Sequence, residues 1–235
     1  MSTSEVIASA FRLYRNHFAN LVLMALAPHL VLLALDLMLA EAGLEPAQVI
    51  SILLLGTAVL NAIVLAAMTQ AISQAALGRG PGVLDSYRAA FSRSLVSIVT
   101  AYLIVWGLVT VGFLLLVLPG LVVGGLLLPT VPVIVLEQRT SLPALAQAYR
   151  MMRPVMAKAT AVFSFVILIS GVIPLGFHLL VGQGPFSPLL GAILGAVTLP
   201  LAYSANVILY FSERSKSGFS ARDLSQWMRE REPDP

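Results

Sequence analysis

The chain has 235 residues, of which 58% are hydrophobic and only 11% are charged. Soluble domains carry about 25% charged residues, so this composition argues against a water-soluble globular protein. The sequence has no cysteine, which excludes disulfides and thiolate chemistry. The net charge is +3, and the basic residues lie in short loops beside apolar runs. Anionic lipid headgroups, rather than nucleic acid, are the expected partner there.

Residues 1–17 are the first predicted element, a short amphipathic helix at the membrane surface. Ser2 and Glu5 have the spacing of a capping box at its start. Apolar and polar residues then follow the period of a helix and define two faces. The apolar face comprises Ile7, Phe11, Tyr14 and Phe18, and the polar face comprises Glu5, Ser9, Arg12 and Asn16.

Six apolar runs follow within a predicted membrane domain, residues 18–213, and a membrane span needs about 20 mostly apolar residues. The runs cover residues 18–40, 48–71, 94–117, 121–136, 159–181 and 188–211. Only Leu118-Pro119-Gly120 separates the third run from the fourth, which predicts a tight hairpin. The fourth run is short and contains Pro129 and Pro132, which predict a kink.

The positive residues fix the expected orientation. All 14 lysines and arginines fall in the N-terminal segment, the second-to-third loop, the fourth-to-fifth loop or the C-terminal tail. On the other side, the first loop carries Glu41 and Glu45. Because positive loops stay in the cytoplasm, we expect a multi-pass protein of a bacterial inner membrane with both termini cytoplasmic.

Two loops and the tail predict further amphipathic helices in the headgroup plane. They lie near residues 83–93, 141–153 and 214–235. The first loop helix has an apolar face of Leu84, Tyr87 and Phe91, and the second has Leu142, Leu145, Tyr149 and Met152. The fold expected is therefore all-α and integral to the membrane, with six transmembrane helices and short interfacial helices on the cytoplasmic side.

An aromatic residue followed by arginine recurs just before each odd-numbered span. The pairs are Phe11-Arg12, Tyr87-Arg88 and Tyr149-Arg150. This recurrence fits three parallel repeats, each made of one interfacial helix and two spans. Any protein built of helical hairpins with positive loops would show a similar pattern, so both interpretations stay open.

The sequence contains no known catalytic signature or metal-ligand spacing, so we predict neither an enzyme nor a cofactor, although an intramembrane active site is not excluded. Polar residues within spans are the remaining candidates, because they often mark function. They are His29, Asp36, Asn61, His178 and Asn206. His29 and Asp36 share one helix face and would flank a proton or ligand path. The favoured interpretation is structural, with His29 bonded to a neighbouring helix and Asp36 at the outer interface.

Two further features predict packing rather than chemistry. Glu137 ends the fourth span and is expected to pair with a basic residue of a neighbouring interfacial helix. Ser187, Gly191 and Gly195 are spaced by four residues, and such a stripe of small residues allows helices to approach closely.

Four short segments resemble a known family. They are Ala10 to Arg15 with Phe18, Val131 to Glu137, Ser141 to Arg150, and Leu209 to Phe211 with Arg214. The chain is similar there to the six-span membrane domain attached to some bacterial glycerophosphoryl diester phosphodiesterases and to related YciC-like membrane proteins. This resemblance implies a six-helix membrane fold. It does not imply phosphodiesterase activity, because catalysis in those relatives belongs to a separate barrel of roughly 250 residues.

The leading functional hypothesis is a non-enzymatic scaffold or accessory factor in envelope or lipid homeostasis. It would contact anionic lipids or a membrane or cytoplasmic protein partner through basic and aromatic residues, although the same residues would also serve as ordinary topology anchors. These residues are Arg12, Tyr14, Tyr87, Arg88, Tyr149, Arg150 and Trp227. The alternative is a small transporter or channel whose polar path would contain His29, Asn61, His178 and Asn206.

Overall fold

The computed structural model describes residues 1–76, 80, 82–91, 95–182 and 186–217. All regular elements in these ranges are helices. Six of the described helical stretches are long and apolar enough to cross a membrane, so the chain is a multi-pass membrane protein. Their elements are α2 (Phe18–Glu41), α3 (Pro46–Ala76), α5 (Leu95–Leu115), α6 (Val117–Leu127) with α7 (Thr130–Glu137), α9 (Met156–Ile167) with η2 (Leu168–Val172) and α10 (Ile173–Val181), and α11 (Ser187–Arg214).

Shorter helices precede three of these spans. They are α1 (Thr3–Asn16), α4 (Val83–Phe91) and α8 (Ser141–Met152). Helix α8 is continuous with the fifth span-length stretch, Ser141–Leu180, through the 3-10 turn η1 (Arg153–Val155), and a second 3-10 turn, η3 (Ser215–Ser217), follows α11. The predicted capping box is confirmed, because the Glu5 backbone N–H donates to Ser2 Oγ and the Ser2 N–H donates to the Glu5 carboxylate. The predicted tail helix and Trp227 lie outside the described residues.

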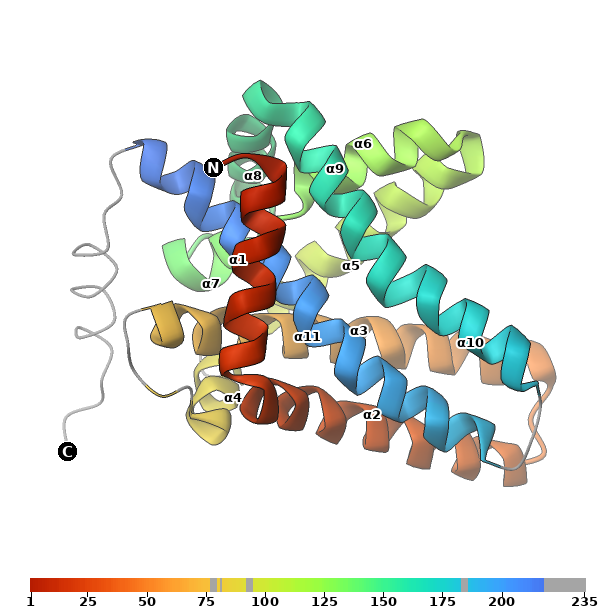
Figure 1. The fold of residues 1–235 in the computed structure, drawn as a ribbon. Coiled ribbons are helices and arrows are strands. Elements are labelled where there is room, and N and C mark those ends of the chain that lie inside the picture. Colours follow the sequence, from red (N-terminus) through yellow and green to blue (C-terminus); the bar gives the residue numbers. More distant parts are fainter. Residues whose placement is uncertain (77–79, 81, 92–94, 183–185, 218–235) are drawn as a thin grey trace.

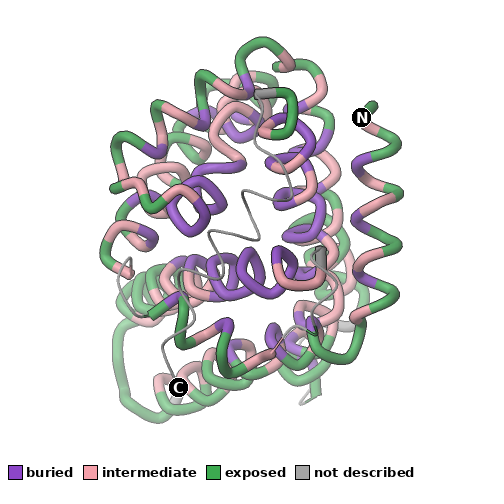
Figure 2. The backbone as a smooth tube through the Cα atoms, turned by 90° about the vertical axis from the view of Figure 1, so that its left-hand side faces the viewer, coloured by how far each residue is buried: buried purple, intermediate pink, exposed green. Residues whose placement is uncertain are grey.

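Helix α11 runs through the middle of the bundle and packs against α1, α2, α3, α9 and α10 (Figure 1). The α5–α6 hairpin packs on α9 through α6 and on α3 through α5. Buried positions gather on the inward sides of the helices, whereas exposed positions lie at the periphery (Figure 2). The largest fully buried side chains include Tyr210, Leu21, Met24, Met68 and Ile72. The main core cluster therefore includes the region where α2, α3 and α11 meet, and a second buried cluster lies where α1, α8, α9 and α11 meet.

The basic side chains of the described residues belong to elements gathered at one end of the bundle, which we call the basic end. These elements are α1, α4, α8, η1, η3, the start of α9, the turn after α7 and the last residue of α11. In Figure 1, α1, α4, α7 and α8 occupy the left half of the view, and the α2–α3, α5–α6 and α10–α11 connections lie to the right. This arrangement agrees with paired spans that return the chain to the same end.

The third and fourth spans join differently from the prediction. The chain turns at Leu116, whose extended backbone (φ −166°, ψ 154°) separates α5 from α6, and the expected Leu118-Pro119-Gly120 turn lies inside α6. Pro119 is tolerated there because the first N–H groups of a helix need no partner within it. A Cβ on Gly112 would lie 2.7 Å from the Cα of Gly120, so glycine permits this close hairpin. The predicted kink is confirmed as the break between α6 and α7 at Pro129.

The fifth span begins at Met156, three residues before the predicted boundary, and contains the π turn η2. Pro174 follows this turn in the first turn of α10. Proline cannot donate to the carbonyl four residues earlier, and its ring clashes with that carbonyl in a regular α-helix. The wider π turn relieves this conflict. The apolar run alone gave no sign of the interruption.

Candidate functional site

Each of the three short helices at the basic end turns one narrow face toward the bundle. The buried positions are Val6, Ala10 and Tyr14 in α1, Ser86 and Ala90 in α4, and Ala144, Ala148 and Met152 in α8. Several of the larger apolar side chains face outward instead. Phe11, Leu84, Phe91, Leu142 and Tyr149 are all exposed. Each helix therefore packs closely on the bundle and leaves much of its predicted apolar face uncovered.

The arginines that the sequence singled out lie beside these exposed apolar residues. Arg12, Arg88 and Arg150 are all exposed. Within the described chain, the hydrogen-bond and ion-pair partners of each lie on its own helix: Ser9, Asp85, and Ala146 with Gln147. The Arg88–Asp85 pair is 3.9 Å apart with both side chains more than 70% exposed, so its attraction is weak. These three guanidinium groups remain accessible to an external anion.

One hydrogen bond fixes each short helix to a span. The Tyr14 hydroxyl donates to the Val197 carbonyl over 2.8 Å, and the Tyr87 hydroxyl donates to the Met24 carbonyl over 2.5 Å. In α8, Ser141 Oγ donates to the carbonyl of Ser97 over 3.1 Å. The hydroxyls of Tyr14 and Tyr87 are thus already bonded within the protein, whereas the Tyr149 ring is exposed.

Replacing Tyr87 with phenylalanine is expected to destabilise the protein by about 1 kcal/mol, the usual net value of one hydrogen bond. Burial raises the pKa of Tyr87 to about 12, so the folded state retains a proton that the unfolded state loses near pH 10. The contribution of Tyr87 is therefore complete below pH 10 and falls as the pH rises toward 12. Unfolding of purified protein between pH 8 and 11.5 would test this. A variant with the same alkaline loss as the wild type would contradict it.

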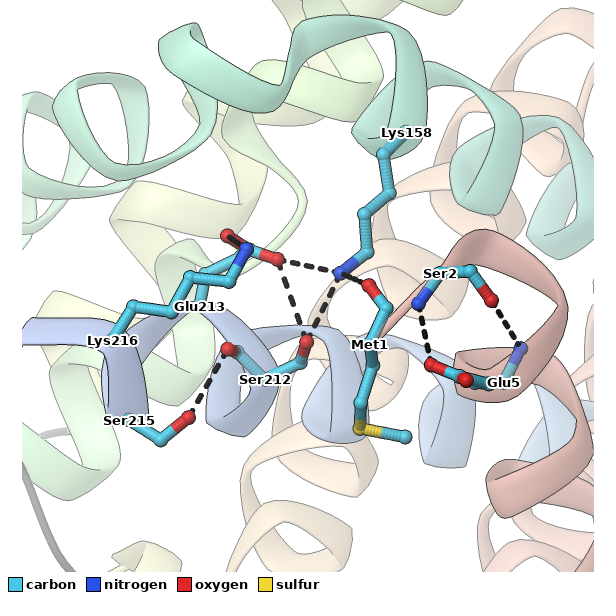
Figure 3. Close-up of polar contacts among 8 residues, drawn as sticks. All are labelled: Met1, Ser2, Glu5, Lys158, Ser212, Glu213, Ser215 and Lys216. Carbon is cyan, nitrogen blue, oxygen red and sulfur yellow. Dashed lines mark hydrogen bonds and ion pairs between the residues drawn. The ribbon is translucent and has the colours of Figure 1, made fainter.

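A buried ion cluster ties α9, α11 and the N-terminal residues together at the basic end (Figure 3). Lys158 Nζ lies 2.5 Å from Glu213 Oε1 and also donates to Ser212 Oγ and to the Met1 carbonyl. Lys216 Nζ lies 2.8 Å from the second carboxylate oxygen of Glu213. The Glu213 side chain is only 4% exposed. Because water barely reaches this carboxylate, its negative charge is stabilised in the folded protein by these two lysines.

A second cluster surrounds Glu137, the last residue of α7. Its carboxylate is 3.1 Å from the Nε atoms of both Arg139 and Arg214 and accepts a hydrogen bond from the Tyr210 hydroxyl. The sequence correctly predicted that Glu137 is paired. The predicted partner was wrong, because Arg214 comes from the end of α11 and Arg139 from the turn after α7, not from an interfacial helix.

An open cavity of about 440 Å³ adjoins the first cluster at the basic end. Its lining combines the α8 residues Gln147 and Arg150 with Glu213 at the end of α11 and Lys216 in η3. Lys158 and Lys216 together carry more positive charge than Glu213 neutralises, and Arg150 adds to this excess. The cavity is therefore suited to an anionic group.

The predicted intramembrane residues do not form one group. Asn61 and Asn206 line the same internal cavity. His29 instead lies against Gly195 of α11, and its Nδ1 is 2.7 Å from the carbonyl of Ala25 on its own helix. His178 is exposed near the α10–α11 connection, 3.4 Å from Ser187 Oγ. The four-residue path is thus divided, and only its asparagines share a cavity.

Asp36 is partly exposed on α2. In the part of the chain that the structure describes, no group of three or more His, Asp or Glu side chains is placed to hold a metal ion. Comparison with known proteins gives no further guidance, because no family model, curated protein or solved structure matches this chain. The case for function therefore depends on the chain's own geometry.

Proposed function

We propose that this protein is a non-enzymatic membrane scaffold or accessory factor of envelope or lipid homeostasis that holds anionic lipids at its basic end. In this proposal the basic end faces the cytoplasm of a bacterial cell, both termini are cytoplasmic, and α1, α4 and α8 lie at the headgroup level. The six-span resemblance noted in the sequence implies the same membrane fold and does not specify a role.

One observation carries the proposal. Each short helix exposes an arginine beside large apolar side chains. In α4, Arg88 lies beside Leu84 and Phe91, while Ser86 and Ala90 face the bundle. An exposed face of this kind matches the boundary between acyl chains and phosphates, because its apolar part enters the hydrocarbon and its cation meets the headgroup. In α8, Ala144 and Ala148 face the bundle, and Arg150 is exposed together with Leu142 and Tyr149.

The test is a lipid titration followed by native mass spectrometry. We expect the double variant Arg88→Gln/Arg150→Gln to bind phosphatidylglycerol about 30-fold more weakly than the wild type. This corresponds to about 1 kcal/mol for each arginine near the surface. Binding of phosphatidylcholine with the same acyl chains should be unchanged, because that headgroup carries no net charge.

The matched control is Arg88→Lys/Arg150→Lys, which keeps both charges and should retain most of the binding. Added salt should weaken phosphatidylglycerol binding by the wild type, since exposed charges are screened. Equal phosphatidylglycerol affinity for the wild type and the glutamine variant would refute the proposal. Similar elution of all three proteins in size-exclusion chromatography would show that folding is unaffected.

A small transporter or channel is the second candidate, favoured by the shared cavity of Asn61 and Asn206. The separation of His29 and His178 from that cavity removes half of the expected path. Solute flux into proteoliposomes that is lost in Asn206→Leu would favour this candidate. Flux that persists in that variant would count against it.

A further inference from the structure

The internal cavity that Asn61 and Asn206 line is separate from the basic end. It has a volume of about 220 Å³ and is bounded by α3, α5, α6, α7, α9, η2 and α11. This volume is smaller than the 300–1,000 Å³ or so of sites for drug-sized ligands. The cavity therefore suits a small molecule or part of one lipid chain.

Polar groups of α3, α5 and α11 meet at this cavity. The Tyr203 hydroxyl donates to the Asn61 carbonyl over 3.3 Å, and Tyr102 of α5 also lines the cavity. Asn206 is 2% exposed, and its Oδ1 has no hydrogen-bond partner among the described residues. A buried acceptor left unpaired costs about 1–3 kcal/mol. A ligand that donates a hydrogen bond would recover part of this cost.

The lining also defines the charge of the ligand. None of the described residues that line the cavity is acidic or basic. A charge at the centre of a bilayer costs at least about 2.5 kcal/mol without a partner, so an ionised ligand is disfavoured. The remaining lining is largely aliphatic and aromatic, including Val105, Val109 and Phe163, which suits a hydrocarbon chain.

The cavity lies close to the outer surface of the bundle on the α5 side. Trp106 lines it and is nevertheless 44% exposed, and this residue lies near the middle of its span. The surface at that depth faces acyl chains. A ligand from the lipid phase would therefore enter past the Trp106 side chain.

We propose that this cavity binds an uncharged amphiphile from the bilayer, with a hydroxyl group on a hydrocarbon chain. The hydroxyl donates to Oδ1 of Asn206, and the chain lies among the aliphatic residues of α5 and α9. Rotation of the Asn206 amide about χ2, a torsion with broad minima, presents its oxygen to the cavity. Primary alcohols of medium length represent this class.

The experiment uses the full chain in lipid nanodiscs and a decanol that carries a diazirine on its chain. After irradiation, mass spectrometry should locate saturable labelling on α5, α9 or α11 peptides. Unlabelled 1-decanol should compete at least about tenfold better than decane, which lacks the hydroxyl, or than decanoate at pH 8, which is charged. Such selectivity corresponds to about 1.4 kcal/mol.

Asn206→Leu should weaken labelling several-fold, and Val109→Phe should weaken it by filling the cavity without changing the polar wall. Ser204→Ala is the matched control, because Ser204 on the same helix also has a buried, unpartnered hydroxyl but does not line the cavity. Arg88→Gln/Arg150→Gln should also label normally, which separates this site from the proposed anionic-lipid site. Unsaturable labelling, equal competition by decane, or equal labelling of Asn206→Leu and Val109→Phe with wild type would each overturn the proposal.

Discussion

Lys158→Met is expected to destabilise the folded protein by about 3 kcal/mol, because it leaves the carboxylate of Glu213 buried without its closest cation. Removal of one partner from a buried ion pair typically costs 3–5 kcal/mol. We place this variant at the lower limit because Lys216 still lies 2.8 Å from the same carboxylate. Equilibrium unfolding of detergent-solubilised protein in sodium dodecyl sulfate would measure the difference.

Two further variants distinguish an unpaired charge from lost packing. Lys158→Met/Glu213→Leu should recover most of the stability, since replacement of both ions by apolar groups is often neutral. Lys216→Met should cost less than Lys158→Met, because the Lys216 side chain is 54% exposed, compared with 13% for Lys158. A double variant no more stable than Lys158→Met would show that the buried charge is not the cause.

Gly125→Ala is expected to cost about 3 kcal/mol by forcing α6 away from α9. A Cβ at this position would lie 2.6 Å from the Thr160 nitrogen and 2.8 Å from the Ala159 carbonyl carbon. Both are backbone atoms, which cannot move aside as a side chain can, and overpacking costs about 1–3 kcal/mol. The same unfolding assay would detect this change.

Gly107→Ala is the matched control for that prediction. This glycine lies on α5 with no atom within 4 Å of the position a Cβ would take. We expect equal or slightly higher stability, because alanine favours helix more than glycine does. Equal stability of Gly125→Ala and Gly107→Ala would mean that the α6–α9 contact tolerates separation.

The number and order of the spans follow from the sequence because hydrocarbon thickness constrains helix length so strongly. Local signals were also reliable. Ser2 and Glu5 form the predicted cap, and Pro129 marks the break in the fourth span. The turn at Leu116 was displaced from Pro119 because a proline suits a helix start as well as a turn. Each of these signals depends only on residues that lie within a few positions of one another in the sequence.

Contacts between distant segments could not be predicted in the same way. Lys158 and Glu213 are 55 residues apart and pair through tertiary packing. Both were visible as charges near the ends of apolar runs, which was the one available signal. The lipid-binding and repeat hypotheses remain predictions of the sequence.

The orientation of each helix about its own axis decides which small and polar residues face a neighbouring helix, and the sequence did not indicate this orientation. Gly191 of the predicted stripe has open space around it, whereas Gly195 contacts the His29 ring. The closest backbone approach of α6 to α9 instead involves Gly125. Similarly, Asn206 faces the cavity and His178 does not. An apolar run shows little contrast between its faces, so sequence alone does not indicate which residues meet.

The π turn Leu168–Val172 gives the fifth span two helical halves that are out of phase. A π turn is equivalent to one extra residue in an α-helix, and one residue corresponds to about 100° of rotation. Side chains of α10 are therefore rotated by roughly a quarter turn from the positions that a continuous helix from α9 would give them. A single-residue deletion within η2 would reset that phase and direct a different row of side chains toward α11.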